Sequence, residues 1–343
     1  MVNRRWGEGR HTGSSLAMAG CGRSAVGMAK TDLLLGIDLG GTKIHAVVLT
    51  AKGKVKATAR AKTEPKRGYK AVLASIVEVA KSAATEAGLK LRGLPAIGIG
   101  VPGPVDHKRG VVITAPNLGW QDRPIAADLA EHFGVPVSVG NDVNMGALGE
   151  VTFGAARGLR SALAAYVGTG LGGGVVVKGK VVNGAHGFGG EIGHVASPFN
   201  PKRRCGCGKL GCLEMTASKK GLMAAAAEAH AAKRRCLLPA GGELKTSHIA
   251  DALAKGCPTT AVAIDELGEA LAWGLAGLGT VLDPQAFILG GGVVEGLHER
   301  ILPTVARRMP AHSFLYQRHA PDLRVAALGD DGVAMGAAAA ACL

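Results

Sequence analysis

Three cysteines and one histidine lie close together near the middle of the chain. Cys205, Cys207 and Cys212 have the spacing CxCxxxxC, and His194 lies shortly upstream. Three thiolates and one imidazole complete a tetrahedral zinc shell with no open position, so such a site stabilises structure and does not activate water. The alternative is a set of unpaired thiols buried as small apolar side chains. Because this segment is rich in Gly, Lys and Arg, it is poor core material, and the sequence predicts a structural zinc site.

Two carboxylates flank this set. Glu191 precedes His194 and Glu214 follows Cys212, and the zinc shell needs neither of them as a ligand. A metal site that fixes neighbouring polar side chains is suited to forming a rigid wall around a polar ligand. The sequence therefore predicts a polar binding surface beside the metal.

The chain contains one pattern twice, in which two apolar runs flank a glycine-rich turn. The first copy is DLGGTK at residues 38–43, and the second is GTGLGGG at residues 168–174. Glycines let the backbone approach a phosphate and point N–H groups at it, although one such turn alone could be a plain hairpin. A Walker loop or a Rossmann fingerprint needs a helix after the glycines, which excludes both. Two copies about 130 residues apart predict two similar domains that each offer a phosphate site.

Two aspartates follow predicted strands. Asp38 ends the first apolar run, where it could position a hydrated metal ion. Asp142 follows a predicted strand over 135–139 and precedes a predicted helix over 145–150, at the edge of the sheet where α/β folds place their chemistry. Asp142 could equally be the N-cap of that helix, so the residues alone leave both roles open.

The remaining periodicity predicts the elements that must position these residues. Residues 117–120 are predicted as a loop, and a helix is predicted to open at Pro124. Gly290–Gly292 ends a strand and could let a nucleobase or ribose lie against the backbone. The apolar positions of 261–282 cover nearly the whole surface of a helix and predict that it is buried. Further strands are predicted over 55–62, 96–101, 111–114, 286–289 and 323–327, and further helices over 69–87, 218–232, 249–255, 297–308 and 332–343.

Composition limits the class of protein. The 343 residues are 47% hydrophobic and 19% charged, which is enough apolar material for a sizeable core in one large domain or two. The formal net charge is +14, but RNP-type aromatics and a helix-turn-helix pattern are absent, so we expect an anionic small molecule and no nucleic acid. No apolar run is long enough to predict a membrane span. Residues 1–31 are expected to be a disordered leader, and seven cysteines without a paired framework favour the cytoplasm.

The motifs DLGGTK, PGP, NDVNMGALGE, GTGLGGG, GGEIGH and CGCGKLGCLE occur in one order that resembles the ROK family, and within it the bacterial glucokinases. The similarity runs from Leu33 to the C-terminus. It implies an α/β fold of two actin-like ATPase (ribonuclease-H-like) lobes around a central cleft. The expected units are a small domain over 32–140, completed by the C-terminal helix 330–343, and a large domain with the zinc site over 141–329. One departure is Val143, where relatives often carry alanine and where we expect little consequence.

The resemblance also implies an activity, namely ATP-dependent phosphorylation of glucose to glucose 6-phosphate with ATP, Mg²⁺ and a structural Zn²⁺. Asp142 is the implied general base on the C6 hydroxyl, and zinc is implied on His194, Cys205, Cys207 and Cys212. The implied sugar-binding residues are Gly103, Asn117, Asn141, Asp142, Glu191, His194 and Glu214. The implied nucleotide-binding residues are Asp38, Gly40, Gly41, Thr42, Lys43, Gly168, Thr169, Gly170, Gly172, Gly173, Gly291 and Gly292.

Other activities within the same family remain alternatives. Kinases for N-acetylglucosamine, N-acetylmannosamine or fructose share the sugar-facing residues, and the basic composition slightly favours polyphosphate as a donor. A sugar-responsive repressor is expected to carry an N-terminal helix-turn-helix of about 60–80 residues, and only about 31 residues precede the first predicted strand here. Relatives are often dimers or tetramers, so a homodimer or homotetramer is expected.

Overall fold

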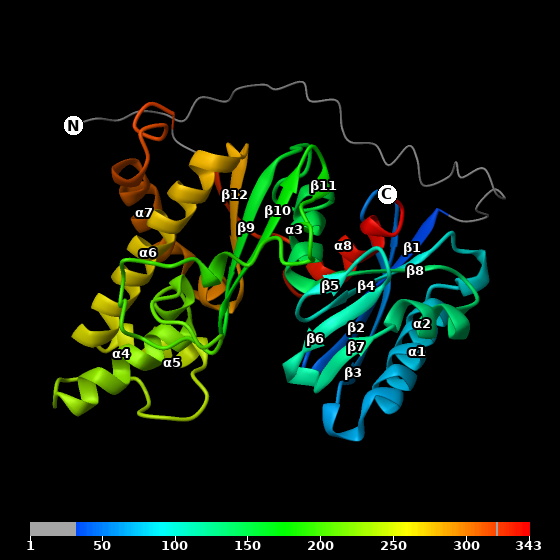
Figure 1. Cartoon of the computed structure of the whole chain (residues 1–343), viewed down its shortest axis with the longest axis horizontal. Coiled ribbons are helices and arrows are strands. Elements are labelled where there is room, and N and C mark those ends of the chain that lie inside the picture. The colour runs from blue at the N-terminus through cyan, green and yellow to red at the C-terminus, as the bar shows by residue number, and fades with distance from the viewer. Residues whose placement is uncertain (1–31, 320–321) are drawn as a thin grey trace.

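A computed structural model describes residues 32–319 and 322–343, so the expected leader at 1–31 lies outside the described residues. Figure 1 shows two α/β lobes side by side, with helices α3 (Asp142–Thr152) and α8 (Gly332–Ala340) between them. Each lobe is built on one five-stranded sheet with its own apolar core. No helix of the described ranges combines the length and apolar character needed to cross a bilayer.

The first lobe has the strand order β3-β2-β1-β4-β8, in which β1 to β3 are antiparallel and β4 and β8 run parallel to β1. Helices α1 and α2 pack on this sheet, as does the C-terminal helix α8, and a small three-stranded sheet, β5-β6-β7, extends from it. The bounds are β1 Leu33–Leu39, β2 Lys43–Thr50, β3 Val55–Lys62, α1 Tyr69–Glu86, β4 Ile97–Val101, β5 Val105–Asp106, β6 Val111–Ala115, β7 Trp120–Arg123, α2 Ile125–Phe133 and β8 Val137–Asn141.

The second lobe repeats this arrangement with the strand order β11-β10-β9-β12-β13. Strands β9 to β11 are antiparallel, and β12 and β13 run parallel to β9, as in the first lobe. The predicted duplication of strand, glycine turn and strand is therefore confirmed. The bounds are α3 Asp142–Thr152, β9 Ala162–Val167, β10 Leu171–Val177, β11 Lys180–Val181, α4 Lys219–Ala231, α5 Thr246–Ala254, α6 Pro258–Leu282, β12 Ala286–Gly290, α7 Gly292–His312, β13 Asp322–Val325 and α8 Gly332–Ala340.

Several predicted elements differ from the structure. Residues 117–120 are not a plain loop, because a 3-10 turn over Pro116–Leu118 leads into β7, where Trp120 pairs with Ala115 and is buried against Tyr69. Helix α6 is not buried all round, since the side chains of Val262 and Val281 are 66% and 82% exposed. Helix α7 begins at Gly292 and not at Leu297, where a non-helical backbone instead produces a kink.

Helix α8 meets its neighbours backbone to backbone. A Cβ added to Gly336 would lie 1.7 Å from the carbonyl oxygen of Met145 in α3. A Cβ added to Gly36 of β1 or Gly98 of β4 would lie 1.8 Å from a carbonyl oxygen of α8. Only glycine allows such approaches, because a real Cβ contact is never this short. The C-terminal helix is therefore fixed to α3 and to two strands of the first lobe.

A buried histidine fastens the segment before α8 to the first lobe. The Nε2 atom of His45 lies 2.7 Å from Oδ1 of Asp331, and Nε of Arg60 donates to Nδ1 of His45 at 3.0 Å. Because Nδ1 accepts from a guanidinium, the proton of the neutral ring is on Nε2, from which it donates to Asp331. Lys43 adds an ion pair with Asp330 at 3.1 Å. Residues from β2 and β3 thus hold the start of the C-terminal helix.

The close crossing of α3 and α8 makes a testable prediction. We expect Gly336→Ala to lower the free energy of unfolding by about 1–3 kcal/mol, because the new methyl group overpacks a contact between two backbones. Equilibrium urea unfolding measures this change. Gly277→Ala in α6 is the matched control, since nothing lies within 4 Å of its added Cβ; it should stabilise the protein by about 0.5–1 kcal/mol. Equal effects of the two substitutions would contradict the close crossing.

Candidate active site

Asp142 lies at the junction of β8 and α3. Asn141 is the N-cap of α3, because its Oδ1 accepts from the backbone N–H of Asn144 at 3.1 Å. The amide nitrogen of Asn141 also donates to the carbonyl oxygen of Gly103 at 3.1 Å. Asp142 is the first residue of the helix, and its Oδ1 accepts from the N–H of Val143 at 2.8 Å. The capping role that the sequence left open for Asp142 therefore belongs to Asn141.

Three carboxylates from different segments influence one another here. Burial raises the pKa of Asp142 to about 6, the N–H of Val143 opposes this, and the negative charge of Glu191 raises it further. Burial also raises the pKa of Asp38 to about 7, with Asp142 adding to the rise and Lys43 opposing it. A carboxylate with a pKa near 6 can accept a proton at neutral pH. A second carboxylate beside it is suited to holding a hydrated Mg²⁺ ion.

The first glycine turn joins β1 to β2. The N–H of Gly40 donates to the carbonyl oxygen of Lys43 at 2.8 Å, and the hydroxyl of Thr63 donates to the carbonyl oxygen of Gly40 at 2.7 Å. Asn117 lies directly against this turn, since a Cβ added to Gly41 would be 3.4 Å from the Cβ of Asn117. The turn thus lies beside one of the residues that the resemblance assigns to the sugar.

The second glycine turn joins β9 to β10 and lies against the start of α3. A Cβ added to Gly172 would be 2.7 Å from Cγ2 of Val143, and one added to Gly173 would be 2.5 Å from the side chain of Ile192. Gly291, with φ +82°, lies against Val167 at the beginning of the same turn. The structure therefore brings the second turn, the start of α7 and the neighbour of Asp142 together.

Glu214 connects the cysteine segment to the second turn. Its side chain is buried, and its Oε1 accepts from Nζ of Lys220 at 2.9 Å and from the thiol of Cys205 at 3.1 Å. Its Oε2 accepts from the N–H of Leu171 at 3.3 Å. Burial raises the pKa of Glu214, but the hydrogen bonds from Lys220, Cys205 and Leu171 and the charge of Lys220 together hold it below its ordinary value. Glu214 is thus ionised beside the glycine turn.

The four predicted metal ligands form one cluster. Their ligand atoms all lie within 4.8 Å of one another, with 3.6 Å between the sulfurs of Cys207 and Cys212 and 3.7 Å between Cys205 Sγ and His194 Nδ1. A tetrahedral zinc ion with bonds of about 2.3 Å to sulfur requires sulfur–sulfur distances of roughly 3.8 Å. The cluster fits such an ion. Nε2 of His194 then faces Oε2 of Glu191 at 3.9 Å.

Two residues of the site were given no role by the sequence analysis. Asn144 is buried and donates to the carbonyl oxygen of Gly189 at 3.2 Å, which ties α3 to the loop that leads into Glu191. Lys220 is the cation that partners Glu214. The NDVN motif could have pointed to Asn144, whereas no local pattern marks Lys220.

A pocket of about 440 Å³ lies where the first lobe meets this loop. It is lined by Asp106, His107 and Lys108 from the β5–β6 hairpin, by Ile113, and by residues 184–188. Gly187, with φ +78°, allows the close approach, because a Cβ there would lie 2.3 Å from the carbonyl oxygen of Val105. The hairpin and the loop therefore form a mixed-charge opening between the lobes, near Glu191.

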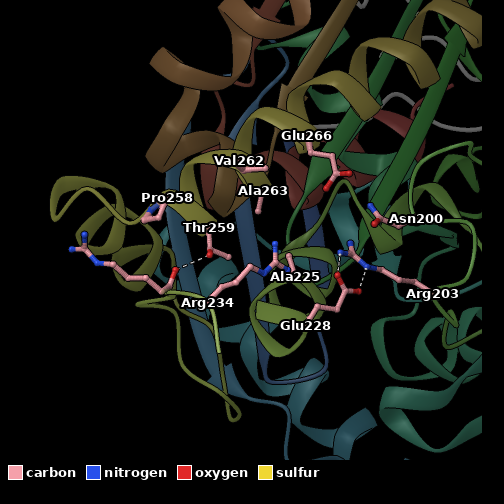
Figure 2. A pocket seen from close by; sticks show the side chains of 11 residues that line it. Asn200, Arg203, Ala225, Glu228, Arg234, Pro258, Thr259, Val262, Ala263 and Glu266 are labelled. Atoms are coloured by element: carbon pink, nitrogen blue, oxygen red, sulfur yellow. Dashed lines mark hydrogen bonds and ion pairs between the residues drawn. The ribbon is translucent and has the colours of Figure 1, made fainter. Parts of the chain in front are cut away.

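Figure 2 shows a different pocket, of about 510 Å³, which is lined in part by Asn200 and Arg203 of the loop before Cys205. Arg203 crosses it in a two-pronged ion pair with Glu228 at 2.8 and 2.9 Å. The same guanidinium donates to the carbonyl oxygens of Met215 at 3.0 Å and Gly221 at 3.4 Å. None of the predicted site residues lines this pocket. Through these hydrogen bonds Arg203 stabilises the segment that carries Glu214 and Lys220.

Comparisons with known proteins agree with this geometry. The chain is 36% identical over 275 residues to a glucokinase of Streptomyces coelicolor, covering 77% of this chain and 83% of that protein. It is 30% identical over 306 residues to the xylose repressor of Caldicellulosiruptor bescii, covering 88% and 76%. The crystal structure of a ROK family glucokinase from Streptomyces griseus in complex with glucose and AMPPNP superposes with a TM-score of 0.73 at 32% identity, covering 90% and 98%.

The sequence model of the ROK family matches residues 34–342, which is nearly all of the described chain. Solved relatives include ROK sugar kinases with the two-lobed actin-like ATPase fold that the duplicated sheets show here. This protein belongs to the ROK family.

Proposed function

We propose that this member of the ROK family is an ATP-dependent glucokinase that forms glucose 6-phosphate and ADP. The observation that carries the proposal is the position of Asp142. Its carboxylate, with a pKa raised to about 6 by burial and by the charge of Glu191, lies at the start of α3 and itself raises the pKa of Asp38. The neighbouring residue, Val143, packs on the second glycine turn. A general base thus lies beside a phosphate-type turn and an acidic, hydroxyl-binding wall.

The reaction follows from these positions. The oxygen of the C6 hydroxyl attacks the γ-phosphorus of ATP, the bond from that phosphorus to the ADP oxygen breaks, and Asp142 takes the hydroxyl proton. Phosphoryl transfer has a loose transition state, so catalysis depends mainly on positioning and on neutralising charge. The N–H groups of both glycine turns are assigned to the phosphates, with Gly291 and Gly292 near the adenosine. Asp38 would hold the water shell of a Mg²⁺ ion, which would neutralise negative charge on the phosphates.

The sugar is assigned to the wall beside the metal cluster. Glu191, His194 and Glu214 would accept or donate hydrogen bonds at its hydroxyls, together with Asn117 and Asn141. Zn²⁺ on His194 and the three cysteines would fix this wall and supply no chemistry of its own, because all four positions are filled by protein. Hydrogen-bonding every hydroxyl rejects analogues that lack one by up to about four or five decades.

The direct test is a panel of acceptors and donors. Glucose, fructose, N-acetylglucosamine and N-acetylmannosamine are offered with ATP and Mg²⁺, and glucose is also offered with polyphosphate, while phosphosugar formation is followed. We expect the highest kcat/KM for glucose with ATP. A clear preference for an amino sugar or for polyphosphate would mean that the protein is a kinase with that acceptor or donor and not an ATP-dependent glucokinase. No phosphorylation of any sugar, with folded protein, would refute the proposal.

Replacing the proposed base tests the mechanism. We expect Asp142→Asn to lower kcat by about 10²–10⁴-fold, the usual contribution of a positioned base. The asparagine oxygen can still accept from Val143, so the helix start is preserved. In the wild type, kcat/KM should fall as the pH drops below about 6, as Asp142 takes up a proton. Coupled phosphosugar assays across pH measure both effects, and residual activity above a few per cent would refute the role.

The same substitution carries its own folding control. The folded-state pKa of Asp142, about 6, lies above the ordinary value of 3.8, so the folded protein loses stability as the pH rises from about 3.8 to about 6, and the full penalty of the buried carboxylate remains at higher pH. Asp142→Asn removes this penalty and should raise Tm at about pH 8 while having little effect at about pH 4. A lower Tm at both pH values would mean that the loss of activity reflects unfolding.

Metal analysis tests the zinc site. We expect one zinc ion per chain, and its removal by a chelator should lower Tm and raise KM for glucose, because the wall loses its anchor. Cys207→Ser should abolish stoichiometric zinc. Cys236→Ser is the matched control, since Cys236 is a free cysteine outside the cluster. Purified wild-type protein without bound zinc, yet with full thermal stability, would overturn the assignment.

A further inference from the structure

Lys220 joins two parts of the site that have separate proposed ligands. Its backbone N–H donates to the carbonyl oxygen of Thr169 in the second glycine turn at 3.2 Å. Its ammonium group donates to Oε1 of Glu214 at 2.9 Å. The side chain of Lys220 is 43% exposed, whereas that of Glu214 is only 7% exposed. One end of this lysine is therefore fixed to the turn, and its charged end reaches both the buried carboxylate and solvent.

The carboxylate of Glu214 lies directly against the turn. Leu171, the residue after the turn, donates its N–H to Oε2 of Glu214 at 3.3 Å. A Cβ added to Gly170 would lie 2.4 Å from this Oε2 and 3.7 Å from Nζ of Lys220. The negative charge of Glu214 thus borders the backbone that is assigned to the phosphates. Without a nearby cation, that charge would repel a phosphate group at the turn.

Lys220 can offset this repulsion and also reach a phosphate. An ammonium group has three donors, and Glu214 Oε1 is its one hydrogen-bond acceptor in the described residues. The segment behind it is held in place, because Arg203 donates to the carbonyl oxygens of Met215 and Gly221, on either side of Lys220 in the sequence. The cation therefore stays at the turn while its remaining donors are available to an anion.

We propose that Lys220 is a phosphate-binding residue for the nucleotide, which neutralises Glu214 and donates to a phosphate oxygen at the turn 168–170. The inference rests on the proposed function, because the ligand of the turn is taken to be an adenine nucleotide. It also explains how an acidic sugar wall can adjoin a site for a polyanion. The carboxylate of Glu214 stays available to the sugar. A phosphate at the turn meets the ammonium group of Lys220, which is the more exposed member of the ion pair.

The test is the affinity of Lys220→Met for ligands of increasing phosphate number, measured by calorimetry on the full chain with Mg²⁺. Adenosine should bind the variant as well as it binds the wild type. The dissociation constant should rise about tenfold or more for ADP and for a non-hydrolysable ATP analogue, as expected for loss of a charged hydrogen bond. Lys220→Arg should retain affinity within about threefold, because the charge and donors remain.

Two controls separate charge from structure. Lys219→Met removes the adjacent lysine, whose backbone also contacts the turn but whose side chain forms no hydrogen bond or ion pair within the described ranges; it should change nucleotide affinity less than about twofold. In Lys220→Met combined with Glu214→Gln, loss of the carboxylate charge should restore part of the affinity for ADP. Recovery of this kind is not expected if Lys220 serves only to hold the fold.

The outcomes are distinct. Equal affinity of Lys220→Met and wild type for the ATP analogue would overturn the inference and leave the kinase proposal intact. Equal weakening for adenosine, ADP and the analogue would assign Lys220 a structural role and would also overturn it. Failure of the wild type to bind any adenine nucleotide would refute the proposed function, and this inference with it.

Discussion

The close contact between helices α3 and α8 fixes the geometry on which the site depends. Gly336 lets the two backbones touch, and Gly36 and Gly98 let α8 lie directly on the strands of the first lobe. Asp142 is the first residue of α3, so the same contacts determine where its carboxylate lies relative to Asp38 at the end of β1. A side chain at any of these crossings would clash with backbone atoms and force the helix to shift. The position of Asp142 therefore depends on the absence of Cβ atoms at these glycines.

Charge balance is the second organising feature. Asp38, Asp142, Glu191 and Glu214 place negative charge around a site whose proposed ligand is itself strongly negative. Burial, with a smaller contribution from neighbouring carboxylates, raises the pKa of Asp38 and of Asp142, so the ionised forms of both are disfavoured in the free protein. Functional sites often hold groups in such strained electrostatic states, because a bound cation or substrate then relieves the repulsion. Mg²⁺ near Asp38 and the ammonium of Lys220 beside Glu214 would each relieve part of it.

Much of the fold could be predicted from the chain because its signals are local. The two glycine turns between apolar runs indicated the duplicated sheets, and the cysteine spacing indicated the cluster with His194. Other features depend on distant partners and escaped prediction. Asn141 caps α3 because β8 extends two residues beyond the predicted end of the strand. Trp120 belongs to a strand because it pairs with Ala115 and packs against the ring of Tyr69. The sequence does not mark Lys220, because its importance depends on its contacts with Glu214 and Thr169, which only the fold brings together.

The contact between Val143 and Gly172 has a consequence for how this lineage can change. The valine methyl occupies the space that any side chain at 172 would need, since an added Cβ there would lie 2.7 Å from Cγ2. The departure from the family pattern at 143, for which little consequence was expected, therefore constrains the opposite loop. A side chain at Gly172 therefore requires Val143 to become smaller or to move, so substitutions at the two positions should be coupled in their effect on stability.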